Sequence, residues 1–280
     1  MTSFVRALSL PVLSLSLVLA APAWAQKFEP QVGQAGKDVI WVPSPDDVVD
    51  RMLTMAQVTP NDFVMDLGAG DGKIAIAAAK KFGARAVGIE YNPDMVKLGN
   101  DNAKLAGVAG NGQGKALIRH GDIFATDFSQ ATVITMYLLP GLNMKLRPQL
   151  LSMRPGTRVV SHSFNMEDWE PDEVASLDGR RAYFWVVPAS VQGAWTLEAA
   201  GERNELALEQ VFQKIAGYVA LGALHAGLRE PRLRGLEIAF AYVDAAGLRR
   251  EFSGRVSNGR MEGSFHDDKG GEGRWTATKR

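Results

Sequence analysis

One short segment combines an acid with three glycines, and a second acid follows after an apolar stretch. The acid and the glycines are Asp66, Gly68, Gly70 and Gly72, and the second acid is Glu90. Glycine has no Cβ, so a backbone rich in it can approach a ligand closely. A carboxylate accepts hydrogen bonds and can hold the two hydroxyls of a ribose. The combination therefore predicts a site for a cofactor that carries a nucleoside.

The elements around these residues place the glycines and Glu90 at one edge of a sheet. Apolar runs predict strands over 63–67 and 86–90, and the residues between them predict a helix over 72–82 that ends at Gly83. The glycines then form the turn after the first strand, and Glu90 ends the second. In open α/β sheets, ligands bind outside the carboxyl ends of the strands.

Three kinds of cofactor compete for this turn. A nucleoside triphosphate loop requires Gly-Lys followed by Ser or Thr, but Gly72-Lys73 is followed by Ile74. The dinucleotide fingerprint requires a third glycine where this chain has Lys73. S-adenosylmethionine (SAM) fits better, because its methionine part carries an ammonium group that an acid such as Asp66 would favour. The remaining alternative is a tight turn that binds no ligand.

These residues and several apolar segments carry a family resemblance. The segments are WVPSP at 41–45, IAIAAAK at 74–80, GARAVGIE at 83–90, YLLP at 137–140 and PGTRVVS at 155–161. The pattern resembles class I SAM-dependent methyltransferases. Within that superfamily it is similar to the small lysine methyltransferases that act on the adenine nucleotide translocase and the ATP synthase c subunit. The similarity runs from about Val39 to Trp169.

The resemblance implies where the cofactor binds. In this superfamily an acid after the third strand meets the adenine amino group, and Asp122 holds that position. The loop before the first helix, residues 41–44, would fold over the cofactor; a core role for Trp41 is the alternative. The expected cofactor-binding residues are Asp66, Gly68, Ala69, Gly70, Glu90, Asp122 and Ile123.

The methyl acceptor is expected at the end of the fourth strand, residues 137–140. Tyr137 is the candidate catalytic residue, because its hydroxyl could orient the acceptor; a buried core tyrosine is the alternative. The Asp/Asn-Pro-Pro-Tyr motif of many amino-group methyltransferases is absent, which disfavours adenine or glutamine as the acceptor. The acidic loop 167–170 is either a solvated loop or an attraction for a cationic lysine.

The leading interpretation is a SAM-dependent methyltransferase that acts on a protein lysine or another amine. The alternatives are an aminopropyltransferase-like enzyme on the same fold and a non-catalytic exported module that binds SAM. Asp66 beside the glycines disfavours the aminopropyltransferase, because it suits a complete methionine part.

Composition excludes several other function classes. Lys and Arg number 31 and Asp and Glu number 31, so the net charge is zero and no nucleic-acid partner is expected. The chain has no cysteine, which excludes disulfides, thiol nucleophiles and cysteine-bound metals. Its four histidines are scattered, and no metal site is expected.

The first residues predict a secretory signal peptide, 1–25. Arg6 precedes an apolar run over 7–21, and Ala23-Trp24-Ala25 matches a cleavage site. The expected location is the periplasm or the exterior, and the alternative is a membrane anchor formed by an uncleaved N-terminus. Export conflicts with the cytoplasmic origin of SAM.

The mature chain is expected to contain two domains after a flexible leader over 26–38. Residues 39–200 predict an α/β domain with a Rossmann-like seven-stranded methyltransferase sheet and helices on both faces. Its remaining strands are expected at 115–119, 132–138, 157–162, 181–187 and 194–199.

The second domain, residues 201–280, predicts a C-terminal antiparallel β meander or small open barrel. Its apolar residues alternate, and Asn258-Gly259 is a strong hairpin signal. We expect this module to pack on the methyltransferase sheet and to leave the cofactor pocket alone.

Overall fold

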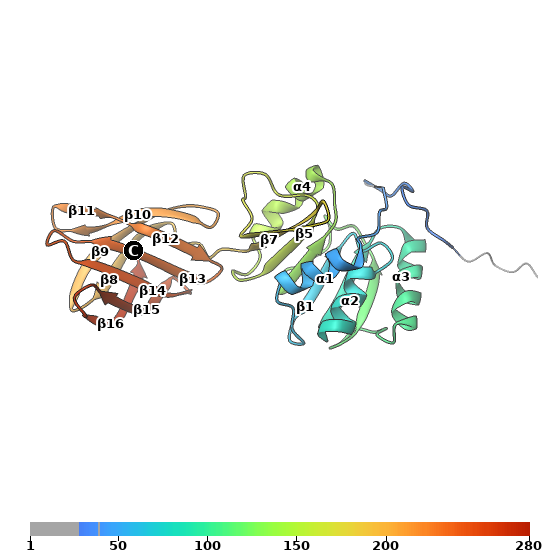
Figure 1. Ribbon diagram of the computed structural model, residues 1–280, viewed down its shortest axis with the longest axis horizontal. Coiled ribbons are helices and arrows are strands. Elements are labelled where there is room, and N and C mark those ends of the chain that lie inside the picture. The colour runs from blue at the N-terminus through green and yellow to red at the C-terminus, as the bar shows by residue number, and fades with distance from the viewer. Residues whose placement is uncertain (1–27, 39) are drawn as a thin grey trace, which may run out of the picture.

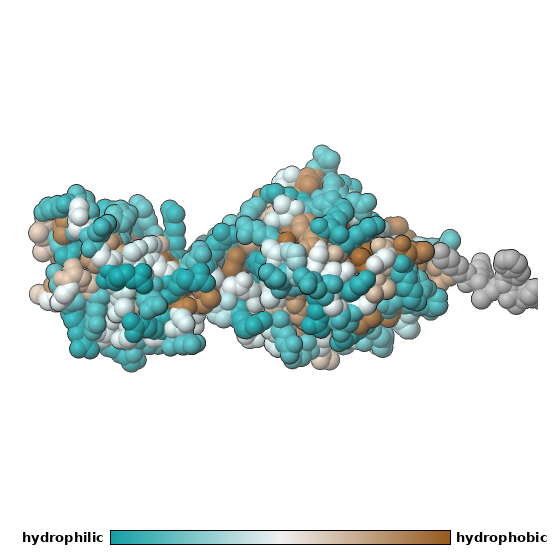
Figure 2. Space-filling model, turned by 90° about the horizontal axis from the view of Figure 1, so that it is seen from below, coloured by the Kyte–Doolittle hydropathy of each residue, from teal (hydrophilic) through white to brown (hydrophobic). Residues whose placement is uncertain are grey.

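The computed structural model describes residues 28–38 and 40–280. The predicted signal peptide lies outside the described residues. Figure 1 shows an α/β lobe followed by a lobe of strands alone, and Figure 2 shows a narrow waist between them. Both parts of the predicted fold class are therefore confirmed.

The α/β lobe contains a seven-stranded sheet with the order β3-β2-β1-β4-β5-β7-β6. The first five strands are parallel, while β7 runs antiparallel to β5 and β6 runs antiparallel to β7. The elements are α1 (Asp46–Met55), β1 (Phe63–Leu67), α2 (Lys73–Phe82), β2 (Arg85–Glu90), α3 (Pro93–Leu105), β3 (Ala116–His120), β4 (Val133–Met136), α4 (Pro140–Leu151), β5 (Arg158–His162), β6 (Glu173–Leu177) and β7 (Arg180–Val186).

Both faces of the sheet are buried, and alternate apolar residues of each strand pack in the core on one face or the other. Val64 packs with α1 and α2 on one face, whereas its neighbour Met65 packs with Leu146 and Leu150 of α4 on the other. Parallel strands covered on both faces are expected to be apolar throughout. The helices thus fix the strands from both sides and hold their carboxyl ends in place.

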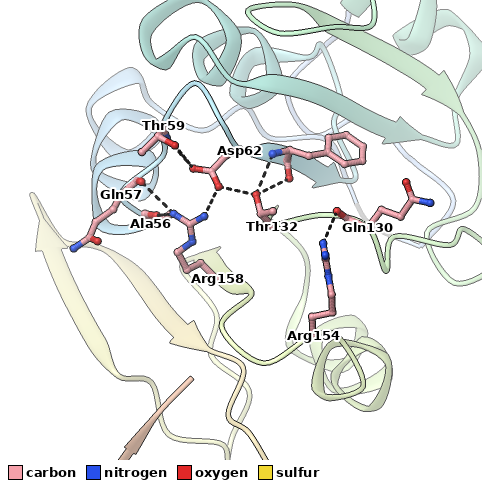
Figure 3. A network of polar contacts seen from close by, with 9 residues as sticks. Ala56, Gln57, Thr59, Asp62, Gln130, Thr132, Arg154 and Arg158 are labelled. Atoms are coloured by element: carbon pink, nitrogen blue, oxygen red, sulfur yellow. Dashed lines mark hydrogen bonds and ion pairs between the residues drawn. The ribbon is translucent and has the colours of Figure 1, made fainter. Parts of the chain in front are cut away.

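A polar network fixes the opposite, amino ends of the central strands (Figure 3). Asp62, just before β1, accepts hydrogen bonds from Thr59 and Thr132 and pairs with Arg158 of β5. Burial opposes ionisation of Asp62, but the hydrogen bonds from Thr132, Thr59 and Arg158 outweigh it and hold its pKa below the usual range. This network ties three neighbouring strands together far from the glycine turn.

Two sequence predictions about this lobe are wrong. The closing hairpin is β6 and β7, and residues 194–199 belong to the second sheet, as part of β8 (Gly193–Ala199). The boundary between the lobes therefore lies before β8 and not at residue 200. Ser44, which precedes α1, makes no capping bond to the helix, and its hydroxyl bonds to His162.

The second lobe is a nine-stranded antiparallel sheet with the order β11-β10-β9-β8-β16-β15-β14-β13-β12. Besides β8 it contains β9 (Glu202–Val211), β10 (Lys214–Leu221), β11 (Leu224–Gly227), β12 (Arg229–Arg234), β13 (Glu237–Val243), β14 (Arg249–Ser257), β15 (Arg260–Asp267) and β16 (Glu272–Lys279). The sheet curls until β10 lies near β12, which gives a nearly closed barrel.

Aromatic side chains fill this barrel. Phe240, Phe252 and Phe265 occupy paired positions on three neighbouring strands, and Trp275 packs edge-on against Phe252. The predicted turn at Asn258-Gly259 joins β14 and β15, and both residues have positive φ. The lobe therefore has its own apolar core.

Candidate active site

All of the predicted site residues lie around one pocket at the carboxyl ends of β1 to β4. The lining includes, from the prediction, Asp66, Gly68, Ala69, Gly70, Glu90, Asp122, Ile123 and Tyr137. The helices on the two faces of the sheet hold these strand ends side by side. No residue of the barrel lobe contributes to the lining of this pocket.

The glycine turn has a shape that other residues would not fit. Gly68 has φ +80, and a Cβ there would lie 2.9 Å from the side chain of Leu138. Gly70 has φ +55, and a Cβ there would lie 2.7 Å from Nε1 of Trp41. Both φ values favour glycine, and both positions are crowded. The turn therefore brings backbone atoms to the pocket surface.

Glu90 fixes the glycine turn to the next loop. Its carboxylate accepts hydrogen bonds from the backbone N–H of Gly70 at 2.8 Å and of Asn92 at 2.9 Å. An ionised carboxylate has about four acceptor positions, so these two bonds leave room for two hydroxyl donors. Glu90 can therefore shape the pocket and bind a ribose at the same time.

Asp66 is a buried acid at the base of the pocket. Its side chain is 2% exposed and accepts a hydrogen bond of 2.8 Å from the hydroxyl of Thr135. Burial raises the pKa of Asp66 to about 7, and the nearby carboxylates of Asp71 and Glu90 add to this effect. The hydrogen bond from Thr135 opposes it. A bound cation would stabilise the ionised form, so the pocket fits the ammonium group of SAM.

The N-terminal segment brings to the pocket a lysine that the sequence does not predict there. Lys37 Nζ lies 2.7 Å from Oδ2 of Asp122, and the other oxygen of Asp122 accepts the backbone N–H of Phe124. The hydrogen bond from Lys37 lowers the pKa of Asp122. The sequence predicts a flexible leader here, but residues 34–38 line the pocket beside Trp41.

The side of the pocket near the end of β4 is aromatic and apolar. Tyr137 packs against His162, with the two rings tilted and their centres 3.9 Å apart, and it stacks with Phe164 at 6.3 Å. His162 Nδ1 and the hydroxyl of Ser44 are 2.8 Å apart in a hydrogen bond. Burial and the charge of Arg180 lower the pKa of His162 to about 4, so its ring is neutral near pH 7. Ser44, Tyr137 and Phe164 line this side, which we call the acceptor side.

Known proteins are similar to about half of this chain. The sequence pattern of the ANTKMT methyltransferase domain matches residues 66–173. A protein-lysine N-methyltransferase of Saccharolobus islandicus is 45% identical over 142 residues, which is 50% of this chain and 86% of that protein. The chain belongs to the ANTKMT methyltransferase family.

Two further relatives agree with this assignment. A Mus musculus lysine N-methyltransferase named for the ATP synthase c subunit is 30% identical, over 59% of this chain and 65% of that enzyme. The crystal structure of an RNA methyltransferase from Salinibacter ruber, in complex with S-adenosylhomocysteine, is 51% identical. It has a TM-score of 0.51 and covers 54% of this chain and 96% of that chain. The predicted superfamily, enzyme class and cofactor are thus confirmed: this ANTKMT-family chain is a SAM-dependent methyltransferase.

Replacing Glu90 tests whether its carboxylate binds the cofactor. Glu90→Ala should weaken SAM binding at least about tenfold, because hydrogen bonds to a charged group contribute about 1.5–3 kcal/mol each. Calorimetry with SAM measures the change. Asp94→Ala, which removes an exposed carboxylate of α3, is the matched control and should leave the affinity unchanged. An unchanged affinity in Glu90→Ala together with a lower melting temperature would mean that Glu90 only supports the turn.

Proposed function

We propose that the enzyme transfers a methyl group from SAM to the side-chain amine of a protein lysine. The observation that carries this proposal is the 45% identity to a protein named protein-lysine N-methyltransferase, over 86% of that protein. The aromatic acceptor side supports it, because aromatic faces attract the ammonium of a lysine and its methylated forms. The expected substrate is then a protein, and the alternative is a small molecule that carries an amine.

The acceptor side can also favour the neutral, reactive form of the amine. SAM supplies a methyl group that its sulfonium has already activated. Leu138, Leu139 and Leu142 surround the end of β4 together with Phe164. An apolar setting disfavours a charged amine and lowers its pKa. Tyr137 then orients the nitrogen, and this positioning is the main help such a displacement needs.

RNA is the second candidate acceptor, because the relative of known structure is named an RNA methyltransferase. The zero net charge disfavours it, since proteins that bind nucleic acid usually carry a basic surface. The two lysines that line the pocket are also paired with acids, Lys37 with Asp122 and Lys73 with Asp46. A protein acceptor therefore agrees better with the charges of the molecule.

The proposal predicts which molecule is labelled by the enzyme. Mature enzyme, methyl-labelled SAM and an extract of membrane proteins and RNA are incubated together, and portions are then digested with protease or ribonuclease. We expect protease-sensitive label on lysine, identified by mass spectrometry. Acetylation of the lysines beforehand should abolish the label. Label that only ribonuclease releases would contradict the proposal.

A variant of Tyr137 belongs to the same experiment. Tyr137→Phe should lower kcat about tenfold or more, because it loses a hydrogen bond to the acceptor, while calorimetry shows SAM affinity within about twofold of the wild type. An unchanged kcat would mean that Tyr137 is only a packing residue.

We also propose that the enzyme is exported, or held at a membrane, by residues 1–25. The support is the order of charge, apolar run and cleavage site in the sequence. Within the described residues, no helix has the length and apolar character needed to cross a membrane.

N-terminal sequencing of the protein from cell fractions checks this location. A start at Gln26 outside the cytoplasm is the expected result, because the signal would be removed after Ala25. An intact Met1 in the membrane fraction would indicate the anchored form. Intact protein in the soluble cytoplasm would contradict both forms.

A further inference from the structure

The turn between β9 and β10 reaches across the waist to the α/β lobe. The ring of Phe212 lies 6.2 Å from the ring of Trp169, nearly parallel to it, and packs against the apolar core of that lobe. Gln213 Nε2 donates a 2.6 Å hydrogen bond to the carbonyl of Glu170, and Lys214 pairs with the Glu170 carboxylate at 2.7 Å. Three consecutive residues of the barrel lobe therefore hold one end of the segment 163–170.

Helix α4 holds the same segment from within the α/β lobe. Arg147 donates a hydrogen bond of 3.1 Å to the carbonyl of Met166 and pairs with Asp168. Its guanidinium also lies over the ring of Phe212, 5.5 Å from the ring centre. Phe212 thus contacts both Trp169 and the arginine that anchors the segment. Two acids of the acidic loop, Asp168 and Glu170, are thus engaged in ion pairs.

The far end of segment 163–170 is the acceptor side of the active site. Phe164 lines the pocket and faces Tyr137. Asn143 Nδ2 donates a hydrogen bond of 3.1 Å to the backbone carbonyl of Phe164. Ser163 and Glu167 have φ values of +63 and +53, a conformation that non-glycine residues rarely adopt. Such backbone persists only where the surroundings enforce it. The segment therefore depends on its external contacts.

The conformation of Phe212 itself indicates that the contact is more than incidental. Phe212 has φ +54, in the left-handed region that glycine or asparagine would occupy with less strain. Gln210 fixes this turn, because its Nε2 donates hydrogen bonds to the carbonyls of Phe212 and Ala189. A bulky side chain is thus kept at an unfavourable backbone position, where its ring covers Trp169.

We propose that the barrel lobe positions the acceptor side of the active site, and that Phe212 is the positioning residue. The contact passes from Phe212 to Trp169 and Arg147, along segment 163–170, and through Phe164 to Tyr137. The barrel lobe contributes no lining residue but determines the shape of the wall against which the acceptor binds. The kinetic test of this inference rests on the proposed function, because it uses a lysine acceptor. The hydrogen-exchange test depends only on the contacts.

The test replaces Phe212 with a residue that suits the turn but lacks the ring. In the full-length enzyme, Phe212→Asn removes the contact and relieves the backbone, so the melting temperature should stay near the wild-type value. Hydrogen exchange of amides in 163–170 should become about tenfold faster. The kcat/KM for a lysine acceptor should fall about tenfold, mainly through KM, while SAM affinity stays within about twofold.

Two further variants make the result specific. Phe212→Tyr keeps the ring and should restore wild-type exchange and kinetics. Asn258→Gly, at another turn of positive φ in the same lobe, should change neither. Unchanged exchange in Phe212→Asn would overturn the proposal, as would faster exchange with unchanged acceptor kinetics. If the wild-type enzyme methylates no lysine, the proposed function fails, and the exchange measurement alone decides whether Phe212 holds the segment.

Discussion

The rest of the active site is arranged around a buried acid. Asp66 lies near the carboxyl end of β1, where burial, reinforced by the nearby carboxylates of Asp71 and Glu90, raises its pKa. A group of acids in a poorly solvated place favours a cationic ligand. SAM carries an ammonium and a sulfonium, whereas a pyrophosphate cofactor would be repelled. The electrostatics of this turn thus select the cofactor, and the cofactor determines the reaction class.

The two sides of the pocket are built from parts of the chain that lie far apart in sequence. The cofactor side comes from the turns after β1 to β3 and from the N-terminal segment, whose Lys37 pairs with Asp122. The acceptor side comes from Ser44 before α1 and from the ends of β4 and β5, and the barrel lobe supports it from outside through Phe212. Methyl transfer depends on the relative position of donor and acceptor. A lobe that contributes no lining residue can therefore still influence the reaction.

One side of the pocket comes from residues that are close in sequence, whereas the other depends on contacts between distant parts of the chain. Asp66, Gly68 and Glu90 belong to one strand–helix–strand unit, so local periodicity and spacing predict that they lie together, and in the structure they line one pocket. Lys37 lies in a polar segment without periodicity, and the bond between Ser44 and His162 joins residues 118 positions apart. Only the folded chain reveals such contacts. The sequence places residues 194–199 in the wrong sheet because alternation shows that a strand has a buried face, but not which strand it pairs with.

Calorimetry of SAM binding at pH 5.5 and pH 7.0 tests the central claim, that the cofactor's ammonium pairs with ionised Asp66. The pKa of about 7 means that Asp66 holds a proton in the free enzyme at pH 5.5, and binding must release it. The account predicts that affinity is about tenfold weaker at pH 5.5, that proton release appears in buffers of different ionisation heat, and that Asp66→Asn removes this pH dependence. Equal affinity at both pH values, with no proton released, would contradict it.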